Sequence, residues 1–316
     1  MLKKRLYSHK SLPEMYHIDV SDNNTLYVET SGNKKGIPII FLHGGPGGNC
    51  RSDHHTLFNP DIFRSIIFDQ RGCGKSRPYR STENNTTQKL IEDIEVIRNF
   101  FKIDKFIIVG GSWGATLALC YAQTFPKFIK GIILRSVFLG TMNEIFWAFL
   151  NGPKIFTPEL HQSFIEFTKE EINENVIKFY VKKIKHEESI LHSWIWHDYE
   201  RILSQIQPEK HSFDSVEEIK SRIDSPVSPL MECHYIENRF FMDDNQILTN
   251  MSKLNDIPGY IIQGRYDLIC PPHNAYSIHK KWSRSNLKLI NTAGHSSTDE
   301  GITENLLDAL ERIVKY

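Results

Sequence analysis

The stretch Lys105–Leu119, KFIIVGGSWGATLAL, contains a short apolar run, a Gly-Gly-Ser-Trp-Gly turn and a second apolar segment. The run Phe106–Val109 indicates a buried strand, and the residues after Gly114 indicate a helix. The sequence G-x-S-x-G between a strand and a helix is typical of a nucleophile elbow. Glycines flank the serine because so sharp a turn strains the backbone and leaves no room for side chains. We therefore predict that Ser112 is a nucleophile.

Composition excludes several classes of protein. The formal net charge is zero, from 38 basic and 38 acidic residues, so nothing indicates a nucleic-acid partner. The basic N-terminus lacks the apolar region of a signal peptide, and no run approaches the length of a membrane span, so we expect a cytoplasmic protein with no membrane partner. Five cysteines without a C-x-x-C pair and histidines without H-E-x-x-H predict reduced thiols and no metal site.

The N-terminal part of the chain alternates between apolar strands and amphipathic helices. A hairpin is expected at Tyr16–Val20 and Thr25–Glu29. Continuous apolar runs, which are typical of strands buried on both faces, then occur at Ile37–Leu42, Ser65–Phe68 and Ile129–Leu134. A helix is expected over 87–101, because Leu90, Ile94, Ile97 and Phe101 recur at helical spacing.

This alternation is interrupted after Arg135, and the pattern of residues 138–251 indicates aromatic-rich helices joined by polar loops. It resumes with a strand at 258–264, a helix at 272–282, a strand at 287–291 and a helix at 303–314. The pattern predicts an α/β fold with a mostly parallel sheet flanked by helices. We expect a core domain from residues 1–137 and 252–316, and an inserted helical cap domain from residues 138–251.

Two glycine-rich loops resemble nucleotide-binding loops only in part. Gly44–Gly48 lacks the Lys-Ser/Thr ending of a P-loop, and residues 72–76 contain G-K-S without the preceding spacing. No nucleotide or other cofactor is therefore expected.

A serine hydroxyl needs an adjacent base, and in this architecture an acid and then a histidine follow the serine in the chain. Asp267 follows the strand at 258–264, and His295 follows the strand at 287–291. Alone, Asp267 is also explained as a helix N-cap and His295 as a loop residue. Their order and their joint placement at strand ends favour a catalytic triad, in which His295 accepts the serine proton and Asp267 orients the imidazole.

The tetrahedral intermediate of such a reaction needs two donors for its oxyanion. One is expected to be the backbone N–H of Trp113, which follows the nucleophile. The other is expected from the loop after the strand Ile37–Leu42, at Gly45 or Gly44.

Five motifs together resemble the proline iminopeptidases (prolyl aminopeptidases), an α/β-hydrolase family: FLHGGPGG, FDQRGCGKSRP, VGGSWGATLAL, QGRYDLICP and AGHS. The resemblance runs from about residue 15 to the C-terminus. It implies an α/β-hydrolase fold and the release of N-terminal proline from small peptides by a serine mechanism, without metal or cofactor. It leaves open whether the protein is a monomer or a homo-oligomer.

The resemblance also implies roles for residues of the cap. Its acidic residues, which bind the free amino terminus of the substrate, match Glu200 and Glu232. A desolvated ammonium group needs opposite charge nearby, which agrees with this assignment. Without the resemblance, each glutamate reads as a solvated helix position.

Further family positions match Phe138 and Phe149 in the pocket for the proline ring, with Arg135 helping to hold the acidic site. Their alternative role is packing in the cap. Two positions depart from the family pattern, because Phe149 stands where a tyrosine is usual and Tyr199 where a tryptophan is usual.

These departures put strict preference for proline in question more than hydrolysis. The alternatives are an aminopeptidase of broader specificity and an esterase for small acyl groups. A binding protein on an inactive hydrolase scaffold is less favoured, because such scaffolds commonly lose a triad residue and all three candidates are present here.

Overall fold

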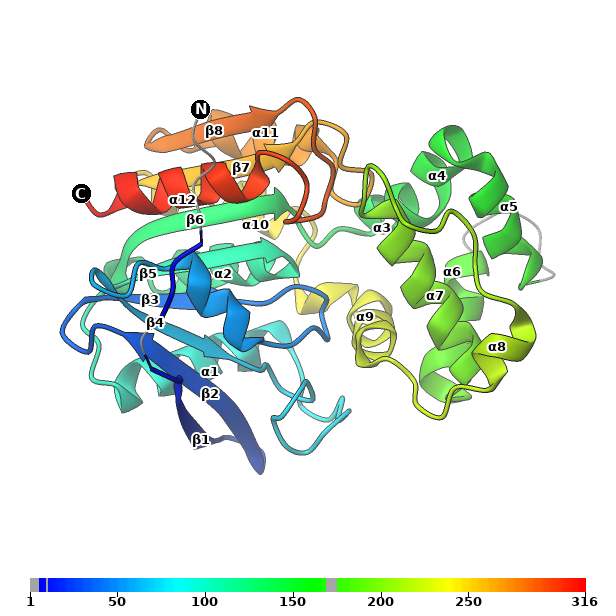
Figure 1. Ribbon diagram of the computed structural model, residues 1–316, viewed down its shortest axis with the longest axis horizontal. Helices are drawn as coiled ribbons and strands as arrows, with labels where there is room; N and C mark the ends of the chain where they lie inside the picture. Colours follow the sequence, from blue (N-terminus) through cyan, green and yellow to red (C-terminus); the bar gives the residue numbers. More distant parts are fainter. Residues whose placement is uncertain (1–5, 10, 169–174) are drawn as a thin grey trace.

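A computed structural model describes residues 6–9, 11–168 and 175–316. Its centre is an eight-stranded sheet in the order β1-β2-β4-β3-β5-β6-β7-β8 (Figure 1). The predicted hairpin is confirmed at one edge, where β1 pairs antiparallel with β2 and β2 with β4. All further pairings are parallel. The strands are β1 (Glu14–Val20), β2 (Asn24–Gly32), β3 (Ile37–Leu42), β4 (Phe63–Phe68), β5 (Phe106–Ser112), β6 (Ile129–Val137), β7 (Gly259–Gly264) and β8 (Ser285–Ile290).

Both faces of the sheet are covered by helices, which explains why its central strands are apolar without interruption. Successive residues of one strand enter different hydrophobic clusters, so that Ile40 lies in one cluster and Ile39 in the other. The first cluster is covered by helices α1 (Thr87–Phe100), α2 (Trp113–Thr124) and α11 (Pro272–Lys281), and the second by α12 (Ile302–Ile313). Two short 3₁₀ helices, η1 (Ser52–Leu57) and η2 (Pro126–Phe128), lie in the connections between strands.

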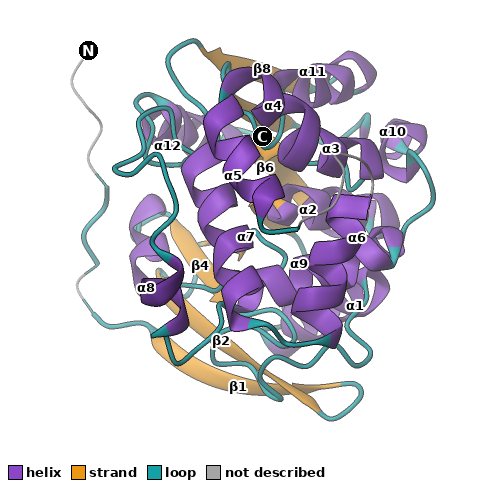
Figure 2. Ribbon diagram, turned by 90° about the vertical axis from the view of Figure 1, so that its right-hand side faces the viewer, coloured by secondary structure: helices purple, strands orange, loops and turns teal. Residues whose placement is uncertain are grey.

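The segment between β6 and β7 is helical, as expected. Helices α3 to α9 lie together beyond the carboxyl ends of the parallel strands (Figure 1), and they stand in front of the sheet in the end-on view (Figure 2). The elements are α3 (Met142–Phe146), η3 (Trp147–Asn151), α4 (Gly152–Phe156), α5 (Pro158–Glu166), α6 (Asn175–Val181), η4 (Lys182–His186), α7 (Ile190–Leu203), α8 (Val216–Lys220), α9 (Val227–Glu237), η5 (Arg239–Phe241), α10 (Gln246–Thr249) and η6 (Met251–Leu254).

The same hydrophobic cluster contains side chains of the sheet, of helix α2 and of the inserted helices. The ring of Trp113 in α2, for example, lies 4.7 Å from that of Tyr235 in α9. The division into a core domain and a cap domain at residues 138 and 251 therefore stays a prediction.

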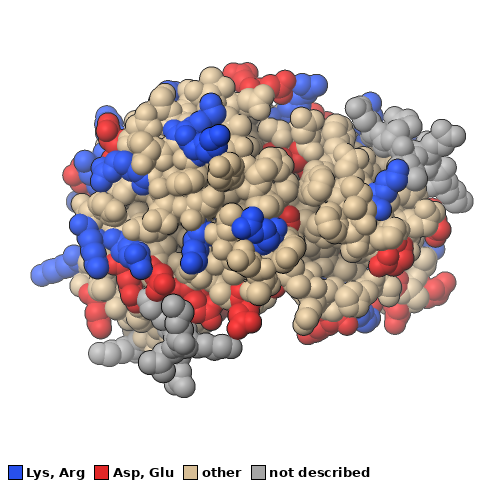
Figure 3. All heavy atoms as spheres, turned by 90° about the horizontal axis from the view of Figure 1, so that it is seen from above, with Lys and Arg blue, Asp and Glu red and all other residues tan. Residues whose placement is uncertain are grey.

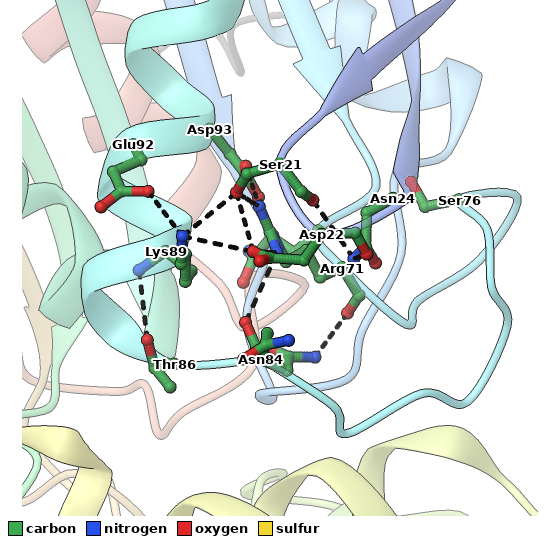
Figure 4. A network of polar contacts seen from close by, with 12 residues as sticks. Ser21, Asp22, Asn24, Arg71, Ser76, Asn84, Thr86, Lys89, Glu92 and Asp93 are labelled. Atoms are coloured by element: carbon green, nitrogen blue, oxygen red, sulfur yellow. Dashed lines mark hydrogen bonds and ion pairs between the residues drawn. The ribbon is translucent and has the colours of Figure 1, made fainter.

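A buried ion pair fixes the loop that follows β4. The guanidinium of Arg71 donates to both carboxylate oxygens of Asp93 in α1, at 2.7 and 2.8 Å, and both side chains are 1% exposed. The same group also donates to Asp22 at 3.0 Å and to Ser21 at 2.8 Å, in the turn between β1 and β2 (Figure 4). One side chain thus joins the turn of the hairpin, the loop after β4 and helix α1.

The surface carries both signs of charge. On the face shown in Figure 3, basic and acidic side chains both lie among uncharged residues, and the acidic side chains that gather at the lower left adjoin basic ones. Across the residues that the structure describes, no helix combines the length and the apolar character needed to cross a membrane.

We expect Arg71→Met to lower the free energy of unfolding by about 3–5 kcal/mol, because it leaves the Asp93 carboxylate buried without its partner. The matched control is Lys89→Met, which removes the more exposed cation of the same network, paired with Asp22 and Glu92 at 3.2 Å each. Since partly exposed pairs contribute about 0–1 kcal/mol, this variant should stay close to the parent protein. Urea unfolding measures both values, and equal losses in the two variants would contradict the assignment.

Candidate active site

Ser112 ends β5 and precedes the first residue of α2, with φ 56° and ψ −126°. A non-glycine residue with positive φ is strained, and such strain is typical of a functional turn. The flanking glycines are explained by close packing. A Cβ atom on Gly110 would lie 2.1 Å from the carbonyl oxygen of Gly114, and one on Gly114 would lie 2.2 Å from that of Leu42 in β3. The predicted elbow is therefore present, with α2 pressed against the neighbouring strand.

His295 and Asp267 follow the ends of β8 and β7. Nδ1 of His295 lies 3.0 Å from each carboxylate oxygen of Asp267. The Asp267 side chain is inaccessible to solvent, and its oxygens accept three further hydrogen bonds, from the backbone N–H of Ile269 and of Cys270 and from the amide of Gln263. These donors hold the carboxylate in one orientation, and the carboxylate in turn fixes the imidazole.

The parallel topology brings these residues to one edge, because β5, β7 and β8 all end there. Asp267 occupies Nδ1 of His295, which leaves Nε2 as the nitrogen for Ser112. Within the described part of the chain, no hydrogen bond joins the Ser112 hydroxyl to this imidazole. Catalytic hydrogen bonds of this kind often tighten only when substrate binds.

Arg135 lies behind this site and not in it. Its guanidinium donates to the backbone carbonyl of His295 and to the hydroxyl of Ser136 at 3.1 Å. A Cβ atom on Gly111 would lie 2.7 Å from an Arg135 nitrogen, so the side chain runs directly beneath the serine turn. The contacts connect Arg135 to the loop of His295, and its expected role in holding the acidic site stays a prediction.

The expected oxyanion donors surround Ser112. A Cβ atom on Gly44 would lie 3.4 Å from Cβ of Ser112, and Gly45, with φ 112°, lines the same pocket as Ser112. The N–H of Trp113 belongs to the first turn of α2, where backbone donors have no intrahelical partner. The indole of Trp113 donates to the side chain of Gln70 at 2.9 Å, which holds the turn against the loop after β4.

A pocket in front of Ser112 is lined both by loops at the carboxyl ends of the strands and by the inserted helices. Apolar side chains form most of its wall, and carboxyl groups lie among them. Its lining includes Gly45, Ser112, Phe138, Glu144, Phe149, Glu200, Glu232, Ile236, Phe240 and Cys270.

Both predicted acidic residues, Glu200 of α7 and Glu232 of α9, line this pocket. Glu200 is partly buried, and Glu232 is 5% exposed. The Oε2 of Glu232 accepts a hydrogen bond of 2.6 Å from the indole of Trp196, while its buried Oε1 has no hydrogen-bond partner among the described residues. Burial raises the pKa of Glu232, and the nearby Glu200 carboxylate raises that pKa further. Burial also raises the pKa of Glu200, although the charge of His295 opposes this effect.

Stacked aromatic rings hold the part of the cap that carries these residues. Phe149 stacks on Trp196 at 4.0 Å, and Phe164 lies between Tyr180 and Tyr199 at 4.3 and 4.0 Å. The hydroxyl of Tyr199 donates to the backbone carbonyl of Phe149 at 3.3 Å. The two residues that depart from the family pattern are therefore in contact, and Phe149 presents an apolar edge to the pocket.

Several pocket residues were not among the predicted site residues, and two of them, Glu144 and Cys270, are ionisable. Glu144 accepts hydrogen bonds from the backbone N–H of Leu139 at 2.8 Å and of Thr141 at 3.0 Å, and burial raises its pKa to about 7. In the sequence, Thr141-x-x-Glu144 signals only a capping box at a helix start. Cys270 places its thiol beside the Ser112 hydroxyl, and burial raises the pKa of that thiol. The residues described contain no group of three or more His, Cys, Asp or Glu side chains that could hold a metal ion.

Comparisons with known proteins agree with this geometry. The model of the family described as alpha/beta hydrolase fold matches residues 37–302. The solved structure of an alpha/beta fold family hydrolase from Bacillus anthracis str. Sterne superposes with a TM-score of 0.64 at 16% identity, covering 95% of this chain and 100% of that one. The expected α/β-hydrolase fold is thereby confirmed.

Curated relatives identify the family within this fold to which the chain is similar. A proline iminopeptidase of Arabidopsis thaliana is 35% identical, over 98% of this chain and 82% of the relative. A probable proline iminopeptidase of Leptolyngbya boryana is 38% identical, over 94% and 93% of the two chains. With this level of identity along nearly its whole length, the chain belongs to the proline iminopeptidase family of α/β hydrolases.

Proposed function

We propose that this protein releases N-terminal proline from small peptides through an acyl-enzyme on Ser112, and that Glu200 and Glu232 bind the free amino terminus. The observation that carries the proposal is the buried Oε1 of Glu232, which lies in a pocket shared with Ser112 and has no hydrogen-bond partner within residues 6–9, 11–168 and 175–316. A buried carboxylate oxygen without a donor is costly, and a substrate ammonium group would supply that donor. The names of the relatives support the same class of substrate.

In the first half of the reaction, Ser112 Oγ attacks the carbonyl carbon of the N-terminal residue. Its proton passes to Nε2 of His295, and Asp267 stabilises the imidazolium through Nδ1. The N–H groups of Trp113 and Gly45 bind the resulting oxyanion. His295 then protonates the departing amine, which leaves as the shortened peptide.

In the second half, His295 removes a proton from a water molecule, and the hydroxide attacks the ester carbonyl on Ser112. Collapse of the second tetrahedral intermediate releases the free amino acid and returns the proton to Ser112. Every proton transfer uses the same imidazole, so no cofactor is required in this sequence.

The pocket supports selection of a prolyl residue in two ways. A secondary ammonium group has two N–H donors, and two carboxyl groups interact with each other at the site where it would bind. The side chains of Phe138 and Phe149 provide apolar surface for the pyrrolidine ring. Binding energy from the amino group and the ring would hold the carbonyl carbon in position for attack.

We expect Asp267→Asn to lower kcat for a chromogenic prolyl amide by about 10⁴-fold, because the wrong imidazole tautomer then faces Ser112. Ser112→Ala should abolish the acyl-enzyme and its labelling by a fluorophosphonate probe. The control is Asp299→Asn, since Asp299 accepts a 2.7 Å hydrogen bond from Gly294 in the same loop without touching the imidazole nitrogens. Turnover that survives Ser112→Ala would rule the mechanism out.

Glu232→Gln should lower kcat/KM for the prolyl amide by about 10–150-fold, which corresponds to the 1.5–3 kcal/mol of a hydrogen bond to a charged group. Hydrolysis of a small acetyl ester should change little, because an ester without an amino group has no ammonium to bind. Glu200→Gln should act in the same direction. Equal losses on both substrates would contradict amine binding, and efficient ester turnover without amide turnover would favour the esterase alternative.

The raised pKa values of Glu200 and Glu232 predict a pH dependence of substrate affinity. A protonated carboxyl group cannot neutralise an ammonium ion, so KM for the prolyl amide should fall as pH rises through the raised range. Dividing kcat/KM for the amide by that for the acetyl ester cancels the titration of His295. This ratio should rise with pH in the parent enzyme and in Glu144→Gln, and should be flat in the double variant Glu200→Gln/Glu232→Gln; a flat ratio in the parent enzyme would refute the prediction.

A further inference from the structure

Helix α9, which carries Glu232, rests on the loop that runs from the FDQRGCGKSRP motif to the start of α1. Four described side chains of this loop and of the start of α1 form hydrogen bonds with the segment inserted between β6 and β7: Arg80, Asn85, Thr87 and Gln88. The proposed chemistry assigns no role to this motif or to the loop after it. Among these four residues, Asn85 alone contacts the turns of α9 on either side of Glu232.

Asn85 is 2% exposed and joins the two parts of the molecule. Its Oδ1 accepts a hydrogen bond of 2.9 Å from the hydroxyl of Tyr235, and its backbone carbonyl accepts one of 2.8 Å from Nε2 of His234. Its Nδ2 lies 3.5 Å from the sulfur of Met231, which also belongs to α9. The same Nδ2 donates to the backbone carbonyl of Arg71, in the loop after β4, at 2.9 Å. Residues 231, 234 and 235 flank Glu232 in the sequence of α9.

The support on which Asn85 rests is itself rigid. The backbone carbonyl that Asn85 binds belongs to Arg71, whose guanidinium is fixed by Asp93 and Asp22 (Figure 4). The position of Asn85 is thus set by a buried ion pair that joins α1 to the hairpin of the sheet.

Close packing leaves α9 little freedom to shift. A Cβ atom on Gly47 would lie 2.6 Å from Cα of Ser228, and one on Gly72 would lie 2.5 Å from the terminal methyl of Met231. Gly47 belongs to the loop expected to form the oxyanion hole. The distance between Glu232 and the site of attack is therefore controlled where α9 meets these loops.

We propose that Asn85 is a positioning residue that fixes α9, so that the Glu232 carboxylate binds the substrate amino group at the correct distance from Ser112. The proposal rests on the proposed function, because it assumes that Glu232 binds an amine. It gives the FDQRGCGKSRP motif a role in selectivity: the motif holds the acidic residue of the cap in place over the nucleophile. Without the Asn85 side chain, α9 would keep its apolar contacts and the hydrogen bond from His234 to the backbone carbonyl. It would lose the link that runs from the Tyr235 hydroxyl through the Asn85 amide to the carbonyl of Arg71.

The test measures kcat and KM for a prolyl amide and for a small acetyl ester in Asn85→Ala, Tyr235→Phe and Thr87→Val. Thr87→Val is the matched control, because it removes one buried hydrogen bond of 2.6 Å between α1 and the carbonyl of Phe240, beyond the end of α9. We expect the amide-to-ester ratio of kcat/KM to fall about tenfold or more in Asn85→Ala, since small misplacements of a binding group cost this much. Tyr235→Phe should lower it in the same direction, and it still provides the test if Asn85→Ala fails to fold.

A purely structural role of Asn85 would change the kinetic constants in a different way. If Asn85 only stabilises the fold, amide and ester rates should fall together and the ratio should match that of Thr87→Val, which would overturn the proposal. An unchanged ratio in Tyr235→Phe would overturn it too, whether or not Asn85→Ala folds. Failure of the proposed function itself is recognised separately, because the unmodified enzyme would then show no dependence of its amide turnover on a free amino group.

Discussion

The close approach of helix α2 to strand β3 sets the geometry of the whole site. The carbonyl oxygens of Leu42 and Gly114 occupy the space where side chains of the serine turn would otherwise lie. This contact forces Ser112 into a positive φ and points the free amides of the helix at the space in front of it. A larger residue at position 110 or 114 would separate the strand from the helix, and the nucleophile would lose its place relative to the loops around it.

The second constraint is electrostatic. Asp267 is buried, but its oxygens accept hydrogen bonds from four N–H donors, which stabilise its charge. Glu232 is buried with one oxygen bonded to Trp196, and its other oxygen has no donor in the part of the chain that the structure describes. The two carboxyl groups differ for this reason: the first is fully hydrogen-bonded and orients an imidazole, and the second keeps one oxygen open to a donor.

The inserted helices connect these two constraints. Their own core is a set of stacked aromatic rings, which fixes α7 and η3. Helix α9 is one of the elements through which they contact the helices and loops around the sheet. Arg71 holds the surface against which α9 rests, so an ion pair at some remove from the serine contributes to the shape of the pocket. Figure 4 shows how many polar groups converge on that single guanidinium.

Local sequence determined the strands, the elbow and the order of the triad candidates, because apolar periodicity and glycine placement act over a few residues. The run Ile37–Leu42 and the turn at Ser112 appear in the structure where the sequence indicated them. The family motifs also pointed to Glu200 and Glu232, but only the tertiary structure shows that both carboxyl groups line one pocket. The contacts of Glu144, Arg135 and Asn85 could not be predicted in this way. Glu144 is recognisable in the sequence only as part of a capping box, and its further partner Asn274 lies far away in the chain. The partners of Arg135 and Asn85, which include His295 and Tyr235, are also distant in sequence. Contacts across long sequence separations depend on how helices and strands pack, and that packing is decided only when the chain is folded.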